Sequence, residues 1–261
     1  MLALSILLCG LVGPAMAQVF VYDDFSEALI DPARWSPNVS GGSLYEMVRQ
    51  ISGGELFEFL LVNGGNRGDV GVAFGRHELR FVRTDFTALL FDATVLTYAL
   101  IGCPTPGSQT STVFVDAPLT LFNDGTTTAQ NDQTGDIAAR LEIFRSTDSI
   151  DPPEVLQTLG QLTRCVDPTC ATREFIGVVS LGQVVLGQRN TFAFYWDAFS
   201  KFVAFWKNAD PPQIIPYPQN LAFRRSYRAL GLSGSAANCT AAPRPLALVH
   251  ASIDNVTIFV P

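Results

Sequence analysis

The sequence predicts an all-β protein in which two antiparallel sheets pack face to face as a sandwich or jelly roll. Short runs rich in Val, Ile, Phe, Thr and Tyr recur between Gly, Pro, Asn and Asp, the pattern of strands separated by turns. Several runs alternate with period two, and no stretch has the length or composition of an interdomain linker. About a dozen strands without a linker indicate one sandwich domain.

The alternation is clearest in the stretch Ala138–Phe144, where Ala139 and Leu141 share one face and Arg140 and Glu142 share the other. This is the pattern of a sheet with one side in the core. The predicted strands are Val19–Phe25, Gly54–Val62, Val70–Phe74, Glu78–Thr84, Phe91–Leu100, Thr112–Asn123, Asp136–Arg145, Thr172–Leu181, Asn190–Asp197, Phe202–Lys207, Arg225–Leu232 and Ala247–Val260.

One or two short surface helices accompany these strands. Asp31–Trp35 has an N-cap Asp followed by Pro, which is enough for one turn. Asp151–Leu159 has an N-cap Asp, prolines in the first turn, an early Glu and then Gly160 as a stop. We expect a short helix there, beside the turn between Cys165 and Cys170.

The first 17 residues resemble a secretory signal peptide, with an apolar run followed by Ala15-Met16-Ala17 as a cleavage site. No Lys or Arg precedes the run, which departs from the usual signal. The mature chain is then residues 18–261, a single domain. No later segment is long and apolar enough to span a bilayer. We therefore expect a soluble protein that is secreted or periplasmic, without membrane insertion.

Four cysteines remain after Cys9 is removed with the signal. An even number in an exported chain favours two disulfides over metal binding or free thiols. Cys165 and Cys170 flank a turn-rich segment and are predicted to pair locally, so that Cys103 pairs with Cys239 by elimination. A zinc site is disfavoured by the spacing and by the distant histidines.

The charge of the chain excludes two classes of partner. The formal net charge is −7 and only 16% of the residues are charged. Nucleic acids and anionic membranes both require clustered Lys and Arg. Neither is expected as a partner.

The segment Thr191–Asn208 holds eight aromatic rings in eighteen positions. With Asp197–Ser200 as the turn, Phe194 pairs with Val203, and the hairpin has one large apolar face. The opposite face is small in the middle and aromatic at its ends, and it carries Thr191, Ala193, Tyr195, Phe202, Ala204 and Trp206. Tyr195, Phe202 and Trp206 are candidates for stacking on a sugar. The alternative is that a loop such as Asn208–Pro218 covers these rings.

The two ends of the mature chain carry a resemblance to a known group. The start contains Asp23-Asp24-Phe25-Ser26 and the segment Ile30–Trp35, and the end contains Ile253-Asp254-Asn255-Val256. This pattern resembles the concanavalin A-like lectin/glucanase superfamily, including laminin-G-like jelly rolls. The resemblance implies that the first and last strands lie side by side and that a structural Ca2+ is bound near Asp24 and Asp254. The alternative is that these carboxylates bond backbone amides.

The superfamily includes hydrolases and lyases, but their residues are not evident here. Glu55 and Glu58 fall on opposite faces of a strand, and the middle Asp of the glucanase motif E-x-D-x-x-E is absent. Arg76-His77-Glu78-Leu79-Arg80 resembles a strand of family-7 alginate lyases, without the Gln-x-His that those enzymes also carry. Arg76, Glu78 and Arg80 share one face and form a candidate carboxylate-binding comb. The alternative is a solvent-facing strand on which Glu78 bridges two arginines.

No nucleophile elbow of the form G-x-S-x-G occurs either. The leading hypothesis is therefore a secreted, non-catalytic protein that binds a glycan or polysaccharide, and no catalytic residue is assigned. One alternative is a polysaccharide-active lyase or hydrolase with Arg76, Glu78 and Arg80 in its cleft. Another is a structural module that mediates protein contacts at the cell envelope.

Overall fold

A computed structural model describes residues 18–41, 45–65, 71–104, 109–127, 129–222, 227–240 and 243–261. The predicted signal peptide and Cys9 lie outside these ranges. Within the described residues the chain forms fifteen strands, β1–β15, and no helix. No helix that could cross a membrane is found among them either.

The strands form two antiparallel sheets. Sheet A has the order β13 (Gln213–Pro216), β12 (Phe202–Lys207), β11 (Asn190–Asp197), β6 (Ala88–Ile101), β15 (Leu246–Val260), β4 (Glu55–Asn63) and β3 (Tyr45–Ser52), with β1 (Gln18–Asp23) also paired to β15. Sheet B has the order β10 (Arg173–Val185), β9 (Val155–Cys165), β8 (Asp136–Ser146), β7 (Thr112–Asn123), β14 (Ala229–Ala237), β5 (Val72–Phe81) and β2 (Trp35–Gly41). The predicted two-sheet sandwich is confirmed.

The core lies between the sheets because the inward residues of nearly every long strand are apolar. On β8, Ala139, Leu141 and Ile143 are buried in this core, as the alternation predicts. Across from them, β4 contributes Leu56 and Leu60 from sheet A. The outward face of each strand is thereby free to carry polar or aromatic groups.

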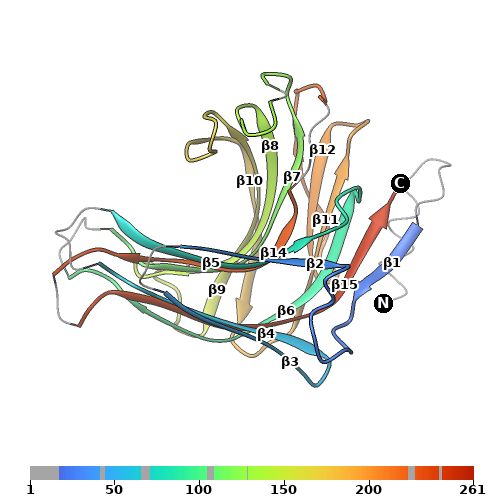
Figure 1. Ribbon diagram of the computed structural model, residues 1–261. Coiled ribbons are helices and arrows are strands. Elements are labelled where there is room, and N and C mark those ends of the chain that lie inside the picture. The colour runs from blue at the N-terminus through green and yellow to red at the C-terminus, as the bar shows by residue number, and fades with distance from the viewer. Residues whose placement is uncertain are drawn as a thin grey trace.

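The first and last strands pair, which confirms the expectation drawn from the end motifs. β1 lies antiparallel to β15, with Val19 opposite Phe259 and Val21 opposite Thr257. The two strands lie next to each other at the right of Figure 1. The N-terminal strand is therefore tied into sheet A.

The predicted register of the aromatic hairpin is wrong by two residues. Phe194 pairs with Phe205 instead of Val203. The turn is one of four residues closed by Asp197 and Phe202, in which Lys201 has a left-handed φ of 56°. The Asp197 carboxylate accepts bonds from two backbone amides of this turn. A shift of two residues preserves the faces, so the division of the hairpin into a core face and an outer face is correct.

The predicted helix at Asp151–Leu159 is wrong. This segment is a turn followed by β9, in which Leu156 and Thr158 face inward with period two. The Arg145 guanidinium donates to the carbonyls of Asp151, Pro152 and Val155, which fixes the turn. Pro and Asp favour turns as strongly as helix starts, and pairing with β8 and β10 decides between them. The other predicted helix, at Asp31–Trp35, is a single turn before β2.

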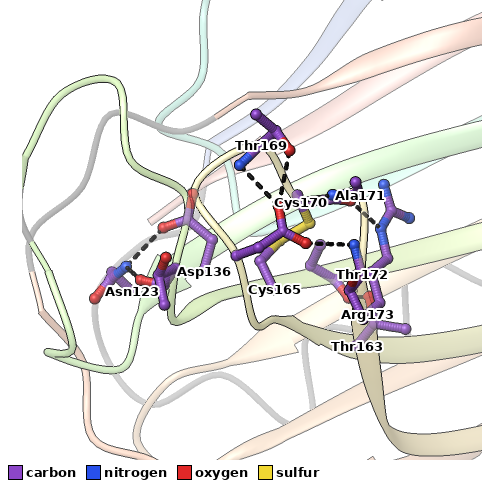
Figure 2. Close-up of a disulfide and its surroundings, with 12 residues drawn as sticks. Asn123, Asp136, Thr163, Cys165, Thr169, Cys170, Ala171, Thr172 and Arg173 are labelled. Atoms are coloured by element: carbon purple, nitrogen blue, oxygen red, sulfur yellow. Dashed lines mark hydrogen bonds between the residues drawn. A yellow bond between two sulfur atoms is a disulfide. The ribbon is translucent and has the colours of Figure 1, made fainter.

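Both predicted disulfides are formed. Cys103 and Cys239 follow β6 and β14, so their bridge links sheet A to sheet B, with the two Cα atoms 6.1 Å apart. Figure 2 shows the second bridge, Cys165–Cys170, which closes the loop between β9 and β10. In that loop one Asp167 carboxylate accepts bonds from Thr169, Ala171 and Thr172.

Sheet B is strongly curved. In Figure 1, β5, β14 and β2 run across the picture, while β7, β8 and β10 rise steeply from that level. Sheet A lies against the convex side, so the outer face of sheet B is concave.

Candidate functional site

The predicted comb of Arg76, Glu78 and Arg80 lies on this concave face. All three belong to β5 and point away from the core, in which His77 and Leu79 are buried instead. Their partners on β14 are Ser233, Gly231 and Ala229, respectively. These partners are small, so the middle of the concave face is a floor of short side chains.

A row of carboxylates crosses the concave face at the level of Glu78. Glu78 pairs with Gly231, Gly231 pairs with Asp116 on β7, and Asp116 pairs with Glu142 on β8. Residues opposite one another in a sheet point to the same side. Four neighbouring strands therefore place three acidic side chains in one line.

Gly231 is required in this row by the close approach of β5. A Cβ atom at Gly231 would lie 2.3 Å from the His77 carbonyl oxygen and 2.8 Å from the Glu78 Cα atom. Its φ of 157° is one that glycine accepts readily and other residues rarely adopt. The gap between the first two carboxylates thus holds backbone alone.

Glu78 is enclosed by groups that hold its carboxylate in place. The Arg76 Nε atom lies 3.1 Å from Glu78 Oε1, and Asn38 and the Tyr227 hydroxyl donate to Oε2. Burial raises the pKa of Glu78, and the Asp116 carboxylate raises it further, against the opposing effect of Arg76. The site therefore favours the protonated form of Glu78 more than water does.

Arg140 joins the other two carboxylates of the row. Its guanidinium pairs with Asp116, and its Nη1 atom lies 2.6 Å from Glu142 Oε1. Ser233 also donates to Asp116, at 2.9 Å, and Gln161 donates to Glu142. Burial raises the pKa of Glu142, while the two acids raise that of Arg140 against its own burial. The Arg140 guanidinium is thus held in ion pairs with Asp116 and Glu142.

Aromatic rings lie beside the charged row. One step along the strands, Ser233 pairs with Phe114 and Phe114 with Phe144. The two phenyl rings stack with centroids 6.1 Å apart, and the Arg140 guanidinium carbon lies 5.1 Å from the Phe114 centroid. Near the start of β5, the Arg76 guanidinium lies over the ring of Phe74, which is 39% exposed. The concave face therefore combines flat apolar surfaces with fixed polar groups.

A glutamate–arginine pair lies behind the row, between the sheets. Glu58 on β4 is completely buried, and its Oε1 atom is 2.6 Å from Arg49 Nε on β3. Burial raises the pKa of Glu58 to about 7, although Arg49 opposes this shift. His77, also in the interior, has its pKa lowered to about 4 by burial and then by Arg49. The other glutamate of this strand, Glu55, points outward to Arg189, so the two lie on opposite faces as predicted.

The predicted stacking residues lie on the opposite side of the molecule. Tyr195 and Phe202 belong to β11 and β12 at the outer face of sheet A, where both are half-buried. Trp206 is only 4% exposed and packs with Ala193 and Ala204. The expectation that Trp206 offers a ring to a ligand is therefore wrong, because a tryptophan beside two alanines sinks onto the sheet between its larger neighbours. The comb and the aromatic hairpin do not line one groove.

The two predicted calcium ligands engage different partners. Asp24 accepts bonds from the Ser26 amide and hydroxyl, whereas Asp254 pairs with Arg189, 2.5 Å from its Nη2 atom. Within the described residues no group of three or more His, Cys, Asp or Glu side chains is arranged to hold a metal. A cation at Asp254 would have to compete with the guanidinium, so these residues do not fit the ion well. Calcium at this junction stays a prediction.

Sequence reasoning missed most of the concave face. It assigned the face of β8 that holds Arg140 and Glu142 to solvent, and it did not single out Asp116 or Phe114. A usable signal was present, because Asp116 interrupts an apolar strand and β8 alternates charged with apolar residues. What the sequence does not display is that β14 brings β5 and β7 together.

No protein-family model and no curated protein matches the sequence. Among solved structures, the GlcNAcα1-4Gal-releasing endo-β-galactosidase from Clostridium perfringens is similar, with a TM-score of 0.51 and 8% identity over 95% of this chain and 64% of that one. This chain thus spans less than two thirds of that structure.

Two further structures resemble the chain more weakly. They are LamAcat from Zobellia galactanivorans, with a TM-score of 0.49 and 8% identity over 92% of this chain and 96% of that one, and a Bacillus licheniformis β-glucanase, with a TM-score of 0.48 and 13% identity over 95% and 100%. At such identities the likeness concerns the fold and transfers no reaction. The two curved antiparallel sheets and the first superposition show that the chain has the concanavalin A-like lectin/glucanase fold.

Proposed function

We propose that this protein binds a polysaccharide on the concave outer face of sheet B. The observation that carries the proposal is the pattern of that face: stacked phenyl rings at Phe114 and Phe144 beside an in-register row of fixed polar groups. Sugars present apolar C–H surfaces edged by hydroxyl groups. A ring next to immobilised carboxylates and guanidinium groups complements both features.

The small side chains of β14 support an elongated ligand. Ala229, Gly231, Ser233 and Ser235 follow one another on the outer face, between the longer side chains of β5 and β7. Ala229, Gly231 and Ser233 are buried, so the surface that a ligand meets is formed by the longer side chains beside them. A polymer lying across the strands would contact rings and polar groups in turn.

Replacing Phe114 by alanine tests the location of the site. We expect the apparent affinity for a bound polysaccharide to fall about tenfold, because truncating a central aromatic contact typically costs more than 1 kcal/mol. The measurement is retardation in native gels that contain a panel of soluble polysaccharides. A thermal melt of the variant establishes that it is folded.

Tyr195→Ala is the matched control, since Tyr195 is an aromatic residue on the outer face of sheet A. Unchanged retardation is expected for this variant. If Tyr195→Ala abolishes retardation and Phe114→Ala does not, the ligand binds the other face and the proposal is wrong.

Hydrolysis of the bound glycan is a second candidate function, favoured by one pair of residues. Asp116 and Glu142 stand directly opposite one another, which places their Cβ atoms about 5 Å apart. Retaining glycosidases act with two neighbouring carboxyl groups, and one of them needs a raised pKa. Burial raises the pKa of Glu142 in this direction. Arg140 lies between the two acids, however, and a substrate would have to displace it, so we rank binding first.

Glu142→Gln separates the two functions. If the protein hydrolyses its ligand, the release of reducing ends should fall at least a hundredfold in this variant, because a glutamine cannot transfer the proton. Retardation by the same polysaccharide should remain. If the wild-type protein releases no reducing ends from any polymer that it binds, hydrolysis is rejected and binding stands.

We also propose that the protein acts outside the cytoplasm. Two formed disulfides support an oxidising compartment, as does the signal-like composition of residues 1–17.

A further inference from the structure

Arginines are the dominant charged residues of the concave face. Four of them, Arg76, Arg80, Arg140 and Arg173, belong to outward-facing positions of sheet B, where they meet three carboxylates. The chain as a whole has a net charge of −7. The concave face thus carries four arginines on a protein that is acidic overall.

The four arginines fall into two classes. Arg76 is paired with Glu78, and Arg140 is paired with Asp116 and Glu142. Neither Arg80 nor Arg173 has an ion pair among the described residues of the chain. Within the part of the chain that the structure describes, Arg173 donates only from Nε, to the Cys170 carbonyl at 3.4 Å, so both arginines keep guanidinium nitrogens for a ligand.

Arg80 is held ready for such a contact. It is exposed, and its guanidinium carbon lies 4.7 Å from the ring centroid of Tyr227. The Tyr227 hydroxyl is itself bonded to Glu78, which fixes the ring. A guanidinium stacked on an immobilised ring loses less freedom when it binds a planar anion.

Arg173 lies in a positive environment. Its side chain is exposed overall, but the guanidinium is partly enclosed, and the pKa of Arg173 is lowered first by this burial and then by Arg140 and Arg76, against the opposing effect of Glu142 and Asp116. A negative group placed there would relieve the repulsion among the three cations. β10 and β5 are five strands apart in sheet B, but Arg173 lies near enough to Arg140 and Arg76 for their charges to interact across the concave face. A polymer lying across the strands can contact both β5 and β10.

We propose that the ligand of this face is a polysaccharide that carries carboxylate or sulfate groups, docked on Arg80 and Arg173. The inference rests on the proposed binding function and specifies its ligand. Both groups are planar or compact oxyanions that a guanidinium binds with paired hydrogen bonds.

The experiment compares charged and neutral polymers on the same protein. Native gels contain polygalacturonate as the carboxylate polymer, dextran sulfate as the sulfate polymer, or laminarin as the neutral one. At low ionic strength at least one of the anionic polymers should bind about tenfold more tightly than laminarin, since bonds between charged groups contribute more than neutral ones. That preference should shrink as salt is added. The two anionic arms show which oxyanion is recognised.

Substitution of the two arginines that lack an ion pair provides the specific test. Arg80→Gln and Arg173→Gln should each weaken binding of the anionic polymer about tenfold and leave laminarin unaffected. Arg83→Gln is the matched control, because Arg83 is exposed, follows β5 and is paired with Asp85. It should behave as the wild type.

The outcomes separate this inference from the function on which it rests. Tight binding of laminarin that depends on Phe114 but not on Arg80 overturns the charged ligand and leaves polysaccharide binding in place. An equal loss in Arg83→Gln also overturns it, because net charge alone would then explain the effect. If the wild-type protein retains none of the three polymers nor any of the wider panel, the binding function itself fails.

Discussion

Replacing Cys103 and Cys239 together by alanine should lower the free energy of unfolding by about 5 kcal/mol. The two cysteines are separated by 136 positions in the chain. A cross-link over so long a loop restricts the unfolded chain strongly, and the loop-closure relation gives this magnitude. The bridge also joins the end of β6 in sheet A to the end of β14 in sheet B. Urea unfolding under non-reducing conditions measures the loss.

Cys165→Ala with Cys170→Ala is the matched control. These cysteines are five positions apart, and the same relation gives about 2 kcal/mol. The bonds to Asp167 also organise this loop without the sulfurs. Equal losses in the two double variants would show that loop closure does not govern either bridge.

Glu58→Gln should stabilise the protein increasingly as the pH rises. The pKa of Glu58 is about 7 in the folded chain against an ordinary value of 4.5, so the fold favours the protonated carboxyl. The stabilisation that this proton gives is fully present below pH 4.5 and is lost as the pH rises through 7. At about 1.4 kcal/mol for each pH unit, the loss is about 3 kcal/mol. A glutamine at this position stays neutral at every pH, so the variant does not undergo this loss of stability.

The measurement is the difference in unfolding free energy between variant and wild type at pH 4 to 8. It should be small at pH 4 and reach about 3 kcal/mol at pH 8. The groups that act on Glu58 are Arg49, Glu78 and Asp116. A difference that does not change with pH would contradict the prediction.

His77 supplies the opposite control. Its pKa of about 4 lies below the usual 6.5, so the fold favours the neutral imidazole. The corresponding stability is present above pH 6.5 and is lost as the pH falls toward 4. His77→Gln should therefore have a higher free energy of unfolding than the wild type at acidic pH, where Glu58→Gln should have the same free energy of unfolding as the wild type.

The architecture was accessible from the sequence because it depends on local patterns. Alternation at Ala139 and Leu141 defines an inward face whatever strand lies next to it. The two faces of the hairpin were predicted correctly because the register was wrong by an even number of residues. The register itself depends on Lys201 adopting a left-handed conformation, for which a lysine gives no signal. The false helix at Asp151–Leu159 arose because Pro and Asp mark turns and helix starts alike.

The candidate site was accessible only in part, because it depends on strand order. Arg76, Glu78 and Arg80 were identified from their spacing within one strand. Their partners Asp116 and Glu142 come from strands that are distant in sequence, and β14 must intervene to align them. The strand order of the whole chain also places the aromatic hairpin in sheet A. The predicted stacking rings therefore lie on the face opposite the concave face of sheet B.

The central positions of β14 and β15 determine when the molecule can take shape during synthesis. β14 separates β5 from β7 in sheet B, and β15 separates β4 from β6 in sheet A. Until these two strands leave the ribosome, sheet B exists at most as two disconnected pieces, and sheet A as two pieces and the separate strand β1. Glu78 and Asp116 are likewise not brought together before β14 has been made. Both sheets can therefore close only after β14 and β15 have been synthesised, and the nascent chain stays open while the strands before them are made.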